Sequence, residues 1–139
     1  MVASVCAWHE HHERAAAELE RRFAQREAMV VAAPALVEAY AVLTRLPPPH
    51  RLSPADAFSL LEANFVDAAR LVALDVRSYR NLLRQAARGS VAGGRTYDSV
   101  IVACAVKAGA SALLTFNATD FQNLVTKGLE IAIPAEASR

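Results

Sequence analysis

The stretch that decides the fold, residues 96–121, reads TYDSVIVACAVKAGASALLTFNATDF. An apolar run follows Asp98, is long enough for a buried helix, and stops at Gly109, a residue type suited to closing a helix. The short apolar segment at residues 111–115 then predicts a strand. A buried helix followed closely by a buried strand is typical of α/β folds with parallel strands.

Outward from this stretch, helical and strand-like segments alternate along the chain. Helices are expected over residues 9–26, 34–46, 53–69, 78–88 and 96–108, and strands over residues 27–33, 71–74, 111–115 and 129–133. Pro34 and Ser53-Pro54 mark helix starts, and Gly89 is expected to close the fourth helix in the left-handed conformation. The alternation predicts a single domain over residues 1–139, an α/β protein with three layers and a central, mostly parallel sheet.

The composition favours a compact protein of the cytoplasm. Apolar residues make up 54% of the chain, yet no run is long enough to span a bilayer, and the first residues do not resemble a signal peptide. Cys6 and Cys104 are expected to be buried thiols rather than metal ligands or a disulfide. The net charge of +1 means that any contact with nucleic acid must come from a local site.

Three acidic residues stand in otherwise apolar surroundings. Glu38 and Asp98 each lie early in a predicted helix, and Asp120 follows a predicted strand. In a parallel sheet these positions share the carboxyl edge, so we expect the three carboxyl groups to lie within about 4–8 Å of one another. Clustered carboxylates repel unless a cation joins them, and Mg²⁺ or Mn²⁺ takes such oxygen ligands and can activate water for attack on a phosphodiester.

Each acid taken alone has a simpler interpretation. An aspartate in the first turn of a helix, such as Asp98, is more often a cap than a ligand. Glu38 alone fits a partly exposed helix carboxylate. Spacing alone therefore leaves the metal hypothesis open.

The order and context of these residues resemble the PIN-domain ribonucleases, in particular the VapC-like toxins of bacterial toxin–antitoxin pairs. In that family an Asp opens a small-residue helix, a Gly-Ala pair closes it, and a strand leads into T-x-N-x-x-D-F, as residues 96–121 do here. Residues 34–38 and 42–45 look like the family's second acidic segment. The resemblance implies that Glu38, Asp98 and Asp120 are catalytic and bind Mg²⁺ or Mn²⁺, with Thr115 and Asn117 supporting them through hydrogen bonds. It also implies an RNA substrate, a cognate antitoxin and a homodimer.

One departure from the family pattern concerns its first acid. Members open with a strand carrying D-T-N or D-T-S, whereas no acid precedes Glu10 here, so we expect a first strand truncated before Met1. This leaves an alternative open, a catalytically impaired PIN-fold protein that binds an antitoxin or RNA. A third, weaker alternative is an unrelated small-ligand binder whose acids are helix caps.

The remaining candidate features have weaker support. His9, His11 and His12 fit a solvated helix start better than a metal site. Arg95 could reach a phosphate or be an ordinary surface arginine, and Trp8 is expected to anchor a core or an interface rather than stack on bases. The chain contains no P-loop, dinucleotide-binding, nucleophile-elbow or zinc-finger motif.

Overall fold

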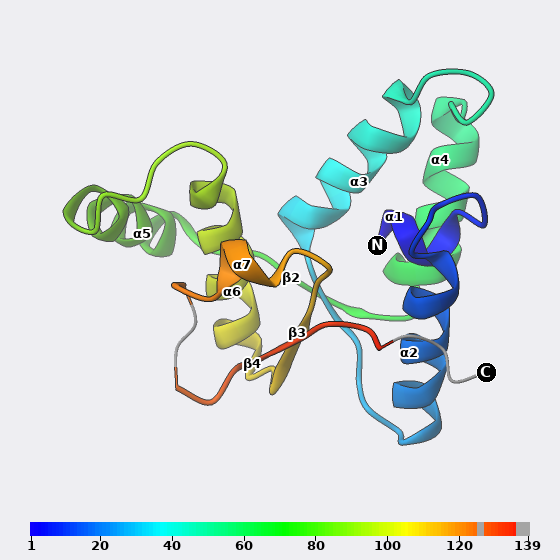
Figure 1. Cartoon of the computed structure of the whole chain (residues 1–139). Helices are drawn as coiled ribbons and strands as arrows, with labels where there is room; N and C mark the ends of the chain where they lie inside the picture. The colour runs from blue at the N-terminus through cyan, green and yellow to red at the C-terminus, as the bar shows by residue number, and fades with distance from the viewer. Residues whose placement is uncertain (125–126, 136–139) are drawn as a thin grey trace. The chain divides into compact units, whose positions relative to one another are not determined.

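The structure is a computed structural model that describes residues 1–124 and 127–135. Its elements, drawn in Figure 1, are α1 (Val2–Val5), α2 (His12–Ala24), β1 (Val30–Ala32), α3 (Ala33–Arg45), α4 (Pro54–Leu61), the π-helical turn η1 (Glu62–Val66), β2 (Arg70–Val72), α5 (Val76–Arg88), α6 (Arg95–Ala108), β3 (Ala112–Leu114), α7 (Ala118–Phe121) and β4 (Glu130–Ala132).

The chain divides into two compact units. The first comprises Met1–Leu71 with Pro134–Arg139, and the second comprises Val72–Ile133. In the described residues β1 pairs with β2, and β3 pairs in parallel with β4, with Leu113 opposite Ile131. The order of helices and short strands, with a parallel pair among them, agrees with the α/β class predicted from the sequence.

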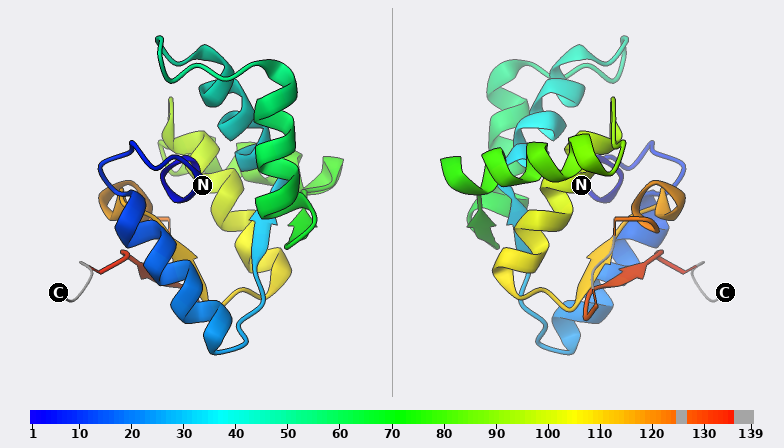
Figure 2. Two further views of the ribbon diagram at one scale, coloured as in Figure 1. Left: turned by 90° about the vertical axis from the view of Figure 1, so that its right-hand side faces the viewer. Right: turned by 90° about the vertical axis from the view of Figure 1, so that its left-hand side faces the viewer.

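In the first unit the core forms around α3 and α4, which lie side by side (Figures 1 and 2). Leu43 of α3 is fully buried against Ala57, Leu61 and Phe65. Ser53 caps α4 as predicted, because its side-chain oxygen accepts a hydrogen bond of 3.1 Å from the Asp56 N–H. The expected continuous helix to residue 69 instead changes to the π-helical turn η1 at Glu62.

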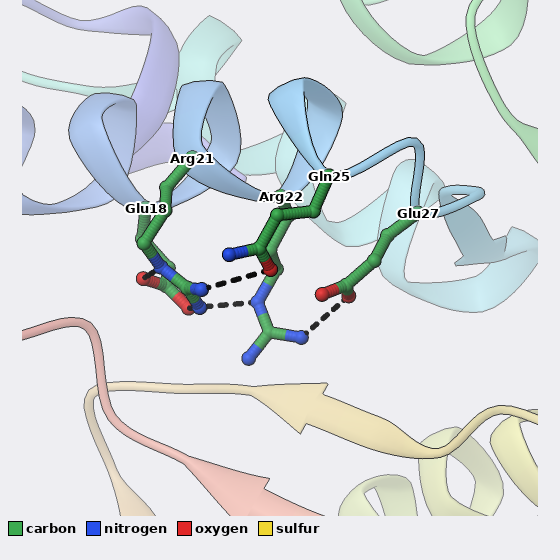
Figure 3. A network of polar contacts seen from close by, with 5 residues as sticks. All are labelled: Glu18, Arg21, Arg22, Gln25 and Glu27. Atoms are coloured by element: carbon green, nitrogen blue, oxygen red, sulfur yellow. Dashed lines mark hydrogen bonds and ion pairs between the residues drawn. The ribbon is translucent and has the colours of Figure 1, made fainter.

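A charged network holds the end of α2 (Figure 3). Glu18 accepts hydrogen bonds from Arg21 and Arg22, each 2.7 Å at its closest, and Arg22 continues to Glu27 beyond the helix at 2.7 Å. Gln25 accepts a further bond from Arg21 at 3.1 Å. The two arginines hold the pKa of Glu18 down to about 2, because their hydrogen bonds favour its ionised form.

We predict that Glu18→Gln destabilises the protein at pH 7 by about 1 kcal/mol, a value kept low because Arg21 is half-exposed. Folding lowers the pKa of Glu18 from 4.5, so its stabilising contribution is complete above that pH and is lost as the pH falls toward 2. Urea unfolding should therefore show a lower free energy of unfolding for the variant than for the unaltered protein at pH 7. This gap should close as the pH is lowered. Glu20→Gln, on the exposed side of the same helix, should show no such gap. A gap that persists at low pH would contradict the role of the charge.

In the second unit the core joins α6, α7 and the β3–β4 pair. Val102, Leu113, Phe121 and Leu129 form one buried cluster. Gly109 ends α6 in the left-handed conformation, at φ 69°, as predicted. The prediction that α6 is buried on nearly all sides is wrong, because only Val100, Val102 and Cys104 of this helix are buried. Tyr97 is 73% exposed, Val106 is 48% exposed, and Lys107 is exposed as well.

Cys104 lies in the buried face of α6 and is 1% exposed, and burial raises the pKa of its thiol. We predict that Cys104 reacts slowly with an aromatic disulfide reagent in the native protein and quickly in urea. Cys6, also buried, is best replaced by alanine so that one thiol remains to be measured. Rapid labelling of the native Cys6→Ala protein would show that α6 is open to solvent.

Several helix boundaries, and the conformation of one helix-closing residue, differ from the sequence prediction. The first long helix begins at His12 rather than residue 9, because residues before it form turns and His11 occupies the cap position. The fourth predicted helix, α5, begins at Val76 rather than residue 78. Asp75 caps it by accepting a 2.7 Å hydrogen bond from the Ser78 N–H, and this bond also lowers the pKa of Asp75. Gly89 is not left-handed, at φ −90°; the left-handed residue is Ser90 at φ 55°.

Candidate active site

Glu38 is carried by α3 in the first unit. The buried strand β1 leads directly into α3, and Pro34 occupies the first helical turn, where its missing N–H costs no hydrogen bond. Ala39 and Leu43 turn toward the core, so the neighbouring Glu38 is left exposed. Its carboxylate is therefore accessible to a ligand from solvent.

Asp98 is carried by α6 in the second unit. The glycines before the helix provide no side-chain cap, since the cap residue is Gly94. Asp98 stands in the first turn, partly buried, where the positive end of the helix dipole favours a carboxylate. A carboxylate at this position suits either a metal ligand or a dipole partner.

Asp120 is held in a short segment that follows β3. The Asn117 N–H donates to the Thr115 hydroxyl oxygen at 3.0 Å, and the Asn117 side-chain amide donates to the carboxylate of Asp120. Phe121, next to Asp120, is buried in the core cluster of the second unit. These contacts position one Asp120 oxygen and leave the other available for a further partner.

The structure places Asp98 and Asp120 on elements that pack together, since α6 contacts α7 within the second unit. Glu38 belongs to the first unit, so its convergence with the two aspartates stays a prediction. The same holds for the metal-binding and catalytic roles of all three acids and for the supporting roles of Thr115 and Asn117.

The available donors suit a hard divalent cation. Each of the three acids offers carboxylate oxygens, which are the ligands that Mg²⁺ and Mn²⁺ prefer. Among residues 1–124 and 127–135, no group of three or more His, Cys, Asp or Glu side chains is arranged to hold a metal ion. Mg²⁺ sites commonly use only one or two protein carboxylates, the remaining ligands being water and substrate phosphate, so the donors present fit that kind of site.

The histidines are less exposed than predicted, and Trp8 lies outside the core. His12 is partly buried and its Nδ1 lies 2.9 Å from the Ala3 carbonyl oxygen, so it joins α2 to α1 instead of standing in solvent. His9 and His11 are partly buried as well, with ring centres 5.6 Å apart. Trp8 lies outside the core, because it is 45% exposed and stacks on His50, and its expected role in an interface stays a prediction. Arg95 is exposed at the first residue of α6.

Sequence reasoning did not single out Tyr97 and His50. Tyr97 is a largely exposed aromatic residue next to Asp98. Its exposure was not predicted, because the apolar run that follows it indicated a buried helix. His50 follows three prolines in the loop from α3 to α4. Its stacking contact with Trp8 is the feature that sets it apart from the other residues of this loop, and the sequence gives no signal of that contact.

The chain belongs to the PIN domain family, whose model matches residues 1–125. This match spans both compact units of the structure.

Two curated relatives illustrate the similarity. The chain is 41% identical to Ribonuclease VapC40 of Mycobacterium tuberculosis over 113 residues, which is 81% of this chain and 78% of the relative. It is 36% identical to Ribonuclease VapC27 of Mycobacterium tuberculosis over 105 residues, which is 76% of this chain and 64% of the relative. In the part of the chain that the structure describes, no helix has the length and apolarity needed to cross a membrane.

Proposed function

We propose that this protein is a metal-dependent endoribonuclease, the toxin of a type II toxin–antitoxin pair. The observation that carries the proposal is its 41% identity, over most of both chains, to a relative named as a ribonuclease. The segment around Asp120, with its carboxylate already hydrogen-bonded to Asn117, supports the same proposal.

Within this proposal the acids provide the ion-binding oxygens. Glu38, Asp98 and Asp120 would hold Mg²⁺ or Mn²⁺, and Asn117, braced by Thr115, would keep the Asp120 carboxylate in a fixed orientation. When bound, the ion supplies the positive charge that activates water for attack on a phosphodiester and stabilises the leaving oxygen. The protein would work in the cytoplasm, as a homodimer restrained by a cognate antitoxin.

The test is a cleavage assay on purified protein with a mixed pool of single-stranded and structured RNA. Cleavage is expected with Mg²⁺ or Mn²⁺ and should stop when EDTA removes the ion. Calorimetric titration with Mn²⁺ should show binding without RNA present. Absence of cleavage over a range of both metals would overturn the enzymatic proposal.

A second candidate function is a non-catalytic PIN-fold protein that binds RNA or an antitoxin. RNA binding in EDTA, measured together with an absence of cleavage in Mn²⁺, would favour this candidate.

A further inference from the structure

Trp8 and His50 form an aromatic stack at the surface of the first unit. Their ring centres lie 4.2 Å apart and their planes are 28° from parallel. Trp8 follows α1, and His50 lies in the connection between α3 and α4, so the stack joins segments far apart in sequence. Trp8 still exposes 45% of its surface. His50 therefore covers one face of the indole ring and leaves nearly half of Trp8 exposed.

The connection that carries His50 is free of negative charge. Residues 39–55 contain Arg45, His50 and Arg51 and no aspartate or glutamate. Arg51, next to His50, is exposed, and its Nε donates to the Leu46 carbonyl oxygen at 2.8 Å. That bond holds the base of the guanidinium and leaves its terminal N–H groups for another acceptor.

The residues that follow Trp8 in the chain add two more ring side chains. The His9 ring lies 5.9 Å from Trp8, and the His11 ring lies 5.6 Å from His9. The nearest acid in sequence, Glu10, has its carboxylate 3.7 Å from His11 Nε2. The exposed indole is thus bordered by the rings of His9 and His50, and the Glu10 carboxylate lies against His11.

We propose that the Trp8–His50 stack is a nucleobase-stacking subsite for single-stranded RNA, with Arg51 contacting the adjacent phosphate. This inference rests on the proposed function, in which RNA is the substrate. An exposed aromatic face accepts any base, since every base has a π surface, and a nearby arginine supplies the attraction for the backbone. A protein of net charge +1 needs such a local site, because its overall field attracts RNA only weakly.

The experiment uses the fluorescence of Trp8, the only tryptophan in the chain. Titration in EDTA with a single-stranded RNA of about ten nucleotides measures binding without cleavage, and the RNA should quench Trp8 because a base stacks on it. Trp8→Ala should weaken the affinity by roughly five- to twentyfold when binding is followed through a dye on the RNA, and Trp8→Phe should retain most of it. In the cleavage assay Trp8→Ala should raise KM and leave kcat unchanged.

Two further variants separate a specific subsite from general surface effects. Phe23→Ala removes another half-exposed aromatic side chain of the first unit and should bind RNA as the unaltered protein does. Arg51→Gln should weaken binding and reduce the slope of log affinity against log salt by about one, the value for one lost phosphate contact.

The outcomes distinguish this inference from the proposed function. RNA cleavage with no change in Trp8 fluorescence, and equal RNA affinity of Trp8→Ala, would overturn the subsite and leave the enzyme standing. Quenching by RNA without cleavage in Mn²⁺ would support the subsite and overturn the enzyme. Unchanged RNA affinity of Trp8→Ala combined with lost binding of a co-expressed antitoxin would overturn the subsite in favour of a protein contact.

Discussion

Replacing Asp98 with asparagine is expected to lower Mn²⁺-dependent RNA cleavage by at least about 100-fold. Changing a residue that only hydrogen-bonds to a metal ligand commonly lowers metal affinity or activity by about 10–100-fold, and Asp98 is proposed as a ligand itself. The substitution keeps the shape of the side chain and removes its negative charge at the start of α6. Calorimetry should show the accompanying loss of Mn²⁺ affinity. Retained cleavage would exclude Asp98 from the ion site.

The same variant tests whether Asp98 is instead a structural residue of the helix start. If Asp98 lies among other carboxylates, removing its charge relieves repulsion, so the variant should melt at or above the temperature of the unaltered protein in EDTA. Asp56→Asn is the matched control, because Asp56 also stands in the first turn of a helix, where it is exposed and hydrogen-bonded to Ser53. It should leave cleavage unchanged and lower the melting temperature slightly. An Asp98→Asn protein that melts well below the unaltered one would identify a helix-stabilising role.

Residues with a local effect made much of the fold predictable from the sequence. Pro34 suits the first turn of a helix through its fixed φ and missing N–H, and it stands at the start of α3. Ser53 caps α4 through an oxygen that reaches an N–H three residues on, and Gly109 closes α6 in a conformation that other residues rarely adopt. Each of these effects involves neighbours within one helical turn, so the sequence pattern was sufficient.

Features that depend on distant contacts were not predictable in this way. The start of α2 depends on His12 contacting Ala3, which lies before the turn. The environment of Trp8 depends on His50, forty-two positions away by residue number, and nothing in either local sequence indicates their stacking. Position within a helix also fails to say how much of its surface is covered, as Val106 shows.

The candidate site likewise has one part that depends on neighbouring residues and one that depends on distant contacts. Thr115, Asn117 and Asp120 lie within six residues of chain, so their hydrogen bonds could be anticipated from the T-x-N-x-x-D spacing. Glu38 lies about sixty residues before Asp98 and in the other compact unit, so no local pattern specifies whether it joins the two aspartates. Its participation therefore needs a functional test.

Glu38→Gln is expected to reduce Mn²⁺-dependent cleavage by about 100-fold as well, and the double variant with Asp98→Asn should be little worse than either single one. If both carboxylates bind the same ion, removing the first already disables the site, so the second removal has little left to change. Independent effects would multiply to about 10⁴-fold instead, and that result would place Glu38 outside the ion site. Glu20→Gln, another exposed glutamate on a helix of the first unit, controls for the loss of a surface charge and should retain full cleavage. Because α3 carries Glu38 on its exposed side, away from buried Ala39 and Leu43, Glu38→Gln should melt in EDTA at or above the temperature of the unaltered protein. That result would show that the loss of cleavage comes from a lost ligand and not from a destabilised fold.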